Sequence, residues 1–286
     1  MAKQSKTAPL RVPCCYQGGK QRISNELVSE IFSKVPFRDS ETRFYDLCSG
    51  SGAVTIELIN HGVRPEQVTM LDRSSWGVFW SSIGNATFDA SVFADHLSHI
   101  PGDKRQVKNY MTRLSSTFTE GDEQYVYPIL QACSFGGKQI WHDGNHWENA
   151  FFRDYWEPTA TSVRQSPANP MQPSPETLLK RVERLVERCP GLECIHDDIG
   201  VMLTRDFEPN SVVYMDPPYR NTTGYAFGFD VDAFIAKFKQ RNPDIPLFVS
   251  ENIPLSTDST LLHFGGAKGG ISGNKTKKHQ EWLSAF

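Results

Sequence analysis

The residues Asp216-Pro217-Pro218-Tyr219 combine an acid, two prolines and an aromatic side chain, which could act together on a ligand. They follow the apolar run 211–215, which predicts a buried strand. Both prolines fix the backbone and lack an N–H group, and the extended geometry before a proline leaves carbonyl oxygens pointing outward. A carboxylate, a fixed carbonyl and an aromatic face suit a flat heterocycle that bears an exocyclic amine. We expect this amine to donate to Asp216 and to the Pro217 carbonyl, with the ring stacked on Tyr219.

Three more acids, Asp46, Asp72 and Asp198, also lie at or just beyond the ends of predicted strands. Ligands of open α/β sheets bind at the carboxyl ends of the strands, so we expect these acids and Asp216 to line one crevice. An acid-lined crevice repels a pyrophosphate, which disfavours a dinucleotide-dependent dehydrogenase. It favours a ligand with positive charge, an amine and hydroxyl groups, and S-adenosylmethionine (AdoMet) has this profile.

Gly50 and Gly52 lie between the strand that contains Asp46 and a predicted helix at 53–61. Glycines let a ligand approach the backbone closely, and the start of a helix supplies N–H donors. The spacing is not GxGxxG, so the turn alone is a weak signal for nucleotide binding. Asp72, at the end of the next strand, strengthens it because an acid at this place suits a ribose diol.

The elements that must position these residues alternate along the chain. Apolar spacing predicts helices at 22–34, 53–61, 76–83, 174–189 and 231–241, and strands at 44–47, 68–72, 192–195, 211–215 and 247–250. This alternation predicts an α/β fold with a doubly wound, mostly parallel sheet. Residues 86–173 show weak periodicity and predict an insertion, and the polar residues 1–12 predict a flexible arm.

Composition narrows the class of protein. The chain has 286 residues and a net charge of −3, so a nucleic-acid partner would need a local basic face. Its six cysteines lack CxxC spacing, so we expect neither a metal site nor a disulfide framework. No apolar run is long enough to cross a membrane, and the first residues lack the apolar core of a signal peptide. We therefore expect a cytoplasmic protein with no membrane partner.

The order of these motifs resembles that of the D12 class (Dam-like) of adenine-N6 DNA methyltransferases. The resemblance covers residues 13–85 and 174–286, and the segment between them matches poorly. The motifs that carry it are Tyr16-Gln17-Gly18-Gly19-Lys20, the glycine turn at 46–54, Leu71-Asp72, Asp198, Asp216-Pro217-Pro218-Tyr219 and Glu281-Trp282-Leu283.

The resemblance implies a Rossmann-like AdoMet-dependent methyltransferase fold, with residues 13–85 and 174–286 as the catalytic domain and 86–173 as an inserted target-recognition region. It implies AdoMet as cofactor, double-stranded DNA as partner, and methylation of the N6 amine of a flipped-out adenine in a bacterial or phage-encoded system. The implied catalytic residues are Asp216, Pro217, Pro218 and Tyr219. The implied cofactor-binding residues are Tyr16, Gly18, Gly19, Lys20, Asp46, Gly50, Gly52, Asp72, Asp198 and Asp216.

DNA contacts and the acceptor remain open at this point. The basic cluster at 104–113 is either a phosphate contact or a solvated face. The acceptor alternatives are RNA adenine or cytosine N4, and a different class of function is an inactive DNA-binding regulator on the same scaffold. The recognition sequence and the oligomeric state, monomer or dimer, do not follow from the sequence. The candidate DNA-binding residues are Lys138, Trp141, Asn145, Lys275 and Lys277.

Overall fold

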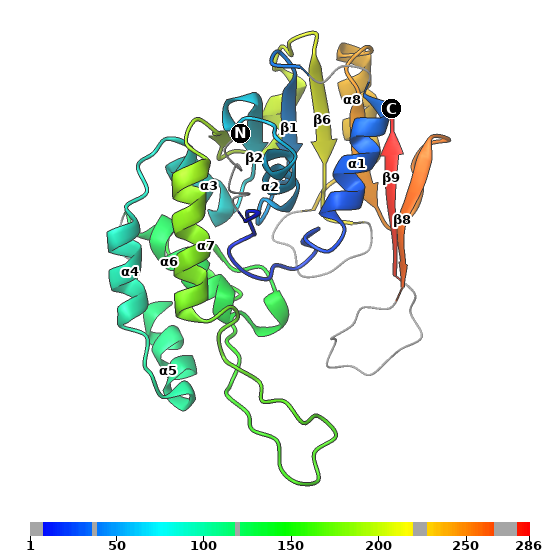
Figure 1. The fold of residues 1–286 in the computed structure, drawn as a ribbon. Helices are drawn as coiled ribbons and strands as arrows, with labels where there is room; N and C mark the ends of the chain where they lie inside the picture. Colours follow the sequence, from blue (N-terminus) through cyan, green and yellow to red (C-terminus); the bar gives the residue numbers. More distant parts are fainter. Residues whose placement is uncertain (1–7, 36–38, 118–120, 220–227, 266–278) are drawn as a thin grey trace, which may run out of the picture.

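The protein is built around one seven-stranded sheet (Figure 1). The computed structural model describes residues 8–35, 39–117, 121–219, 228–265 and 279–286. Five strands run parallel, the sixth in spatial order is antiparallel to its neighbour, and the last is antiparallel to the sixth. In spatial order they are β5 (Glu193–Ile195), β2 (Val68–Leu71), β1 (Arg43–Leu47), β6 (Ser211–Met215), β7 (Leu247–Glu251), β9 (His279–Ala285) and β8 (Ser259–Gly265).

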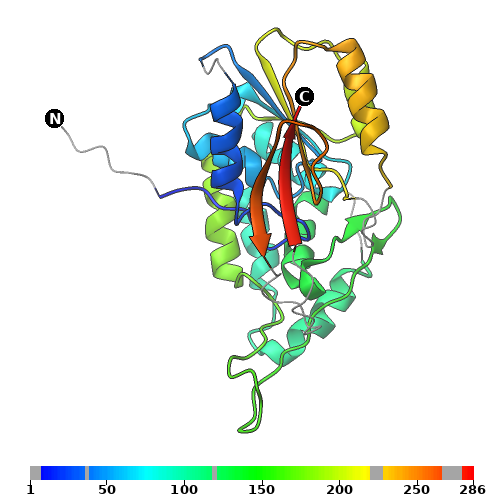
Figure 2. The ribbon, with the colours of Figure 1, turned by 90° about the vertical axis from the view of Figure 1, so that its right-hand side faces the viewer.

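Helices cover both faces of the sheet. On one face the core contains apolar residues of α1 (Ser24–Lys34), α2 (Ala53–Asn60), α3 (Ser75–Gly84) and α7 (Pro175–Arg188). On the other it contains α8 (Val231–Arg241) and the 3₁₀ helix η3 (Ile199–Leu203). Figure 2 shows α1 and α8 on opposite sides of the β8–β9 hairpin. The predicted α/β class and the mostly parallel sheet are therefore confirmed.

The register of the central strands brings the predicted site together. Leu47, the last residue of β1, lies opposite Leu71 of β2 on one side and Met215 of β6 on the other. All three strands run parallel, so the chain leaves them at the same edge of the sheet. Asp72, Asp216 and the turn that follows Leu47 consequently start from adjacent points.

The start of the chain differs from the prediction. Residues 1–12 were expected to form a flexible arm, but the described residues 8–12 pack against the body. Leu10 and Val12 are buried, and the Leu10 N–H donates to Oδ1 of Asn60 at 2.8 Å. Two apolar residues in a short polar segment were too few to show a periodic pattern, so the sequence did not reveal this contact.

Most of residues 86–133 are helical, although their periodicity is weak. The helices are α4 (Ala90–Ser98), α5 (Lys104–Leu114) and α6 (Glu123–Cys133). Packing is continuous across residue 86, because the Phe88 ring contacts both Phe79 of α3 and Tyr125 of α6. Residues of α6 are buried from 125 to 133, so no polar face marks it as a helix.

The rest of the predicted insertion is less regular. The 3₁₀ helix η2 (Phe135–Gly137) leads into a small hairpin of β3 (Trp141–His142) and β4 (Trp147–Glu148). Residues between 153 and 170 then form a long arm that projects from the body (Figures 1 and 2). The short 3₁₀ helix η1 (Pro65–Gln67) directly precedes β2. Within the described ranges, no helix is long and apolar enough to cross a membrane.

The close approach of α3 to β5 yields a stability prediction. A Cβ on Gly84 would lie 1.8 Å from the Leu192 carbonyl oxygen. Gly84→Ala should therefore force α3 away from the sheet and lower the free energy of unfolding by about 1–3 kcal/mol. Gly102→Ala, where a Cβ meets nothing within 4 Å, should change it by less than about 0.5 kcal/mol. Urea denaturation of both variants measures this difference, and equal stabilities would contradict the tight packing.

Candidate functional site

The turn after β1 is strained and held from behind by a tryptophan. Cys48, Gly50 and Gly52 all have positive φ, at 60°, 50° and 76°. A Cβ on Gly52 would lie 2.3 Å from the Trp80 ring, so only glycine fits there. The Trp80 indole N–H donates to the Gly50 carbonyl at 3.1 Å. The turn is thus rigid, and Gly50 is buried at the base of the cavity that is described below.

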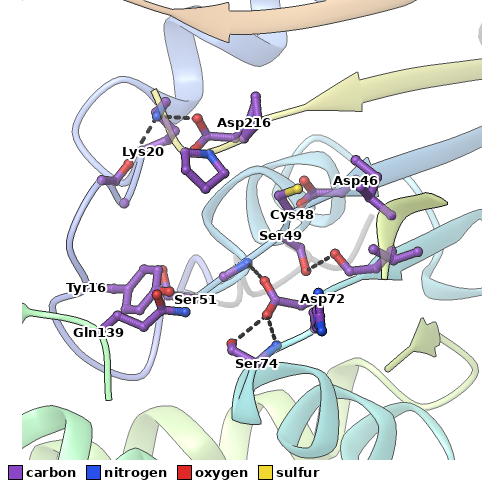
Figure 3. A pocket seen from close by; sticks show the side chains of 18 of the residues that line it. Tyr16, Lys20, Asp46, Cys48, Ser49, Ser51, Asp72, Ser74, Gln139 and Asp216 are labelled. Carbon is purple, nitrogen blue, oxygen red and sulfur yellow. Dashed lines mark hydrogen bonds and ion pairs between the residues drawn. The ribbon is translucent and has the colours of Figure 1, made fainter. Parts of the chain in front are cut away.

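Asp72 joins this turn to the second strand. Its Oδ2 accepts from the Gly50 N–H at 2.6 Å, and its Oδ1 accepts from the backbone N–H and hydroxyl of Ser74 at 2.8 and 2.5 Å (Figure 3). The side chain is buried and lines the cavity described below. Both carboxylate oxygens are therefore fixed in place, and their remaining lone pairs are available to a ligand hydroxyl.

Asp46 lies beneath the turn and bonds to the first residues of α2. Its Oδ2 accepts from the Thr55 N–H at 3.1 Å and from the Thr55 hydroxyl at 2.7 Å. Burial raises the pKa of Asp46 to about 7, and the two bonds from Thr55 lower it only in part. Near neutral pH this carboxyl is consequently present in both protonation states.

Asp216 follows β6, and its backbone N–H donates to the Leu47 carbonyl at 3.1 Å. Its Oδ1 is 2.7 Å from the Lys20 ammonium. Burial raises the pKa of Asp216 to about 6; the Lys20 charge and a hydrogen bond with Tyr219 oppose this rise, whereas the Glu281 charge adds to it. The carboxylate form therefore predominates at neutral pH.

Lys20 is buried, with 6% of its side chain exposed, and its ammonium also bonds to the Gly18 carbonyl at 3.1 Å. It lies 4.7 Å from the centre of the Tyr219 ring. The resemblance implied a cofactor contact for Lys20. In the structure the side chain lines the same cavity, but its ammonium is paired with Asp216 (Figure 3). The Lys20 ammonium therefore holds the Asp216 carboxylate in place.

These residues line one open cavity at the carboxyl edge of the sheet. Of the residues predicted to bind cofactor or to act in catalysis, Gly52 alone is not in its lining, because it packs on Trp80 instead. Asp198 is at the exposed rim, 3.0 Å from Arg73. The predicted residues in the lining are Tyr16, Gly18, Gly19, Lys20, Asp46, Gly50, Asp72, Asp198, Asp216, Pro217, Pro218 and Tyr219.

The lining also contains residues that the sequence did not single out. Gln139, which is buried, lies beside Tyr16 and Ser51 in Figure 3, although it belongs to the predicted insertion. The Gln17 N–H donates to the Gly137 carbonyl at 2.7 Å, which ties the same segment to the Gly18-Gly19-Lys20 turn. No spacing in the sequence connects residues so far apart. The other additions include Cys48, Ser49, Ser74, Ile199 and Phe229.

Among the candidate DNA-binding residues, those that the structure describes do not belong to this lining. Lys138 and Asn145 are exposed and Trp141 is half-buried, on the segment and hairpin that follow η2. Lys275 and Lys277 lie outside the described residues. In the basic cluster on α5, Lys108 is paired with Asp154 at 2.5 Å and Arg105 with Glu157 at 3.5 Å. These ion pairs reduce the cluster's positive field.

One group of possible metal ligands occurs in the described ranges, on the β3–β4 hairpin. Ligand atoms of Asp143, His146 and Glu148 lie within 4.8 Å of one another. Both ring nitrogens of His146 already face carboxylates, at 3.3 Å from Asp143 and 2.6 Å from Glu148. The three residues do not line the cavity, and the group gives no reason to place a metal in the site.

Comparison of the chain with protein-family models and with curated proteins finds no match. The site must therefore be interpreted from its own geometry.

The raised pKa of Asp46 yields a prediction about stability and pH. The pKa is about 7 in the folded protein and 3.8 ordinarily, so the folded state binds more protons between these values and stability falls as pH rises through them. Asp46→Asn keeps an acceptor for Thr55 but cannot ionise. Above pH 7 the variant should be more stable than wild type by a few kcal/mol, because each pKa unit between the folded and ordinary values corresponds to about 1.4 kcal/mol.

Urea denaturation between pH 4 and 8 provides the measurement. Asp206→Asn is the control, because that side chain is 97% exposed. Parallel stability curves for wild type and Asp46→Asn would show that Asp46 ionises without cost in the folded protein.

Proposed function

We propose that this protein is an AdoMet-dependent DNA methyltransferase that transfers a methyl group to the N6 amine of a flipped-out adenine. One observation carries the proposal: a single cavity contains both halves of such a site. The strained glycine turn with Asp72 forms one half, and Asp216-Pro217-Pro218-Tyr219 forms the other. The two halves would hold the methyl donor and the acceptor amine next to each other.

The sheet order supports this choice over a dinucleotide-binding enzyme. Numbered along the chain, the strands of the seven-stranded sheet lie in the order 3-2-1-4-5-7-6, with the seventh reversed. The dinucleotide-binding order is 3-2-1-4-5-6. The reversed strand β9 next to the fifth strand departs from that order, which argues against a dinucleotide-binding enzyme.

The charges in the cavity fit AdoMet. Among the lining residues that the structure describes, the lysine and arginine side chains are Lys20 and Arg73, and each is paired with a carboxylate. A pyrophosphate would find no uncompensated cation here, whereas the acidic lining attracts a sulfonium and an amine. Asp72 and the Gly50 turn would hold the ribose, and Asp198, Ile199 and Cys48 would surround the adenine ring. When bound, AdoMet supplies an electrophilic methyl group.

Asp216 and the Pro217 carbonyl would act on the acceptor. Lys20 bonds to Oδ1 of Asp216, and the exocyclic amine would donate to a remaining lone pair of this carboxylate. Two accepted hydrogen bonds would turn the nitrogen lone pair toward the methyl donor. A bond to a charged acceptor contributes about 1.5–3 kcal/mol, whereas alignment of two reactants can contribute about 7–11 kcal/mol. Positioning should therefore dominate, with Asp216 receiving the proton late.

Tyr219 would stack on the flipped base. One face of its ring carries the Lys20 ammonium at 4.7 Å from the ring centre, so the base would lie on the other face. Extrusion from a duplex costs a few kcal/mol and needs contacts outside the cavity. The hairpin with Trp141 and Asn145, the loop residue Lys138, and Lys275 and Lys277 remain the candidates for those contacts.

The acceptor can be decided directly. The protein is incubated with methyl-labelled AdoMet and double-stranded DNA, and the DNA is digested to nucleosides. Label in N6-methyldeoxyadenosine is the expected result. Label in cytosine or in added RNA would redirect the proposal to another amine acceptor, and binding of DNA without any label would favour an inactive regulator.

Cofactor identity yields a second prediction. AdoMet at about 100 times its dissociation constant should stabilise the folded protein by about 2.7 kcal/mol, seen as a higher melting temperature in a thermal-shift assay. ATP and NAD carry phosphate charges that the acidic lining repels, so they should leave the melting temperature unchanged. Stabilisation by NAD in place of AdoMet would remove the methyltransferase proposal.

Asp216 is the residue on which the chemistry depends most. Asp216→Asn should lower the methyl-transfer rate about 10²-fold or more, because the variant loses the charged acceptor. Stabilisation by AdoMet should persist. Asp244→Asn, at an exposed carboxyl before β7, should keep the wild-type rate. A wild-type rate in Asp216→Asn would refute the assigned role.

A further inference from the structure

Resting on the proposed function, we propose that Glu281 is a positioning residue that holds Lys20 and Tyr219 around Asp216 and shares the Lys20 charge with that carboxylate. Glu281 belongs to β9, the reversed strand of the sheet. It does not line the cavity and would touch neither ligand. Its effect on the reaction would therefore pass through Lys20 and Tyr219.

The contacts of Glu281 converge on one carboxylate oxygen. The Tyr219 hydroxyl donates to Oε1 of Glu281, and the Lys20 ammonium is 3.5 Å from the same atom. Lys20 in turn bonds to Oδ1 of Asp216 at 2.7 Å. One ammonium is thus shared between a carboxylate on β9 and one that directly follows β6, with the Tyr219 ring beside it.

Glu281 is an unusual residue for its place. Its side chain is 4% exposed, and buried glutamates are rare unless they are paired. A buried ion pair is weak evidence for stability, since apolar residues of similar volume often stabilise as well or better. Leu283, also buried on β9, shows that the strand accepts an apolar side chain. The contacts of Glu281 with catalytic residues give a better reason for its presence than stability does.

The electrostatic effect has a definite sign. The Glu281 charge raises the pKa of Asp216, and the Lys20 charge lowers it. Glu281→Gln keeps an oxygen that can accept from Tyr219 but removes the competing charge, so Lys20 would act on Asp216 alone. The pKa of Asp216 should then fall. Lys20→Met should raise it, because the carboxylate loses its cation.

Other titratable groups also act on this site. Tyr214 of β6 and Cys48 of the turn both interact with Asp216, and burial raises the pKa of each well above its usual range. They stay neutral below pH 8. Asp46 of β1, with a pKa of about 7, titrates in the same range as Asp216. Each comparison should therefore be repeated in an Asp46→Asn background, which removes that titration.

The first measurement is the pH dependence of single-turnover methyl transfer at saturating AdoMet and DNA. The acid limb should move to lower pH by about one unit in Glu281→Gln and to higher pH in Lys20→Met. Glu208→Gln is the matched control, because Glu208 accepts from the Tyr45 hydroxyl at 2.7 Å and precedes β6 at the opposite edge of the sheet. Its acid limb should coincide with that of wild type.

The second measurement needs no reaction. The Asp216 carboxyl carbon is titrated by NMR in protein with labelled aspartate, and its signal is assigned by its loss in Asp216→Asn. Opposite shifts of the Asp216 midpoint in Glu281→Gln and Lys20→Met would support the role of Glu281, even if methyl transfer failed to appear. Active wild-type enzyme with an unchanged midpoint in Glu281→Gln would overturn it and leave the proposed function intact. If Glu281→Gln does not fold, Glu281→Leu is measured in its place, because it removes the same charge.

Discussion

The ion pair between Lys20 and Asp216 joins parts of the chain that 196 positions separate. It holds the Gly18-Gly19-Lys20 turn against the end of β6, and so closes one side of the cavity. Lys20 is buried and Asp216 is 18% exposed. Removing either partner would leave a largely buried charge without its counter-charge, which is destabilising in proteins. The position of Asp216, in the proposed acceptor half of the site, therefore depends on a loop near the start of the chain.

The other half of the site depends on packing beneath the sheet edge. Trp80 limits position 52 to glycine and bonds to the Gly50 carbonyl, while Asp72 bonds to the Gly50 N–H. The turn is thus clamped from two sides and does not need a ligand to take its shape. Trp80 belongs to α3, which packs on α6 of the predicted insertion, so the insertion's helices help to support the glycine turn of the proposed cofactor half.

The link between the insertion and the cavity is also direct. Gln139 lines the cavity, and the Gly137 carbonyl accepts from Gln17 in the loop that precedes Lys20. A region that the resemblance assigns to target recognition thus contacts the predicted cofactor loop through the backbone. Weak sequence similarity hid this contact, because backbone hydrogen bonds place little demand on residue type.

The sequence by itself determined the alternation of strands and helices, and with it the edge at which Asp46, Asp72 and Asp216 meet. Short-range patterns suffice for this, because apolar periodicity and glycine turns are local and parallel strands share a carboxyl edge. The tertiary structure alone decided that Lys20 faces Asp216, that Glu281 joins them from β9, and that residues 8–12 are packed. These contacts join distant segments whose charges and apolar groups must satisfy one another on burial, and no local pattern records which partners they find.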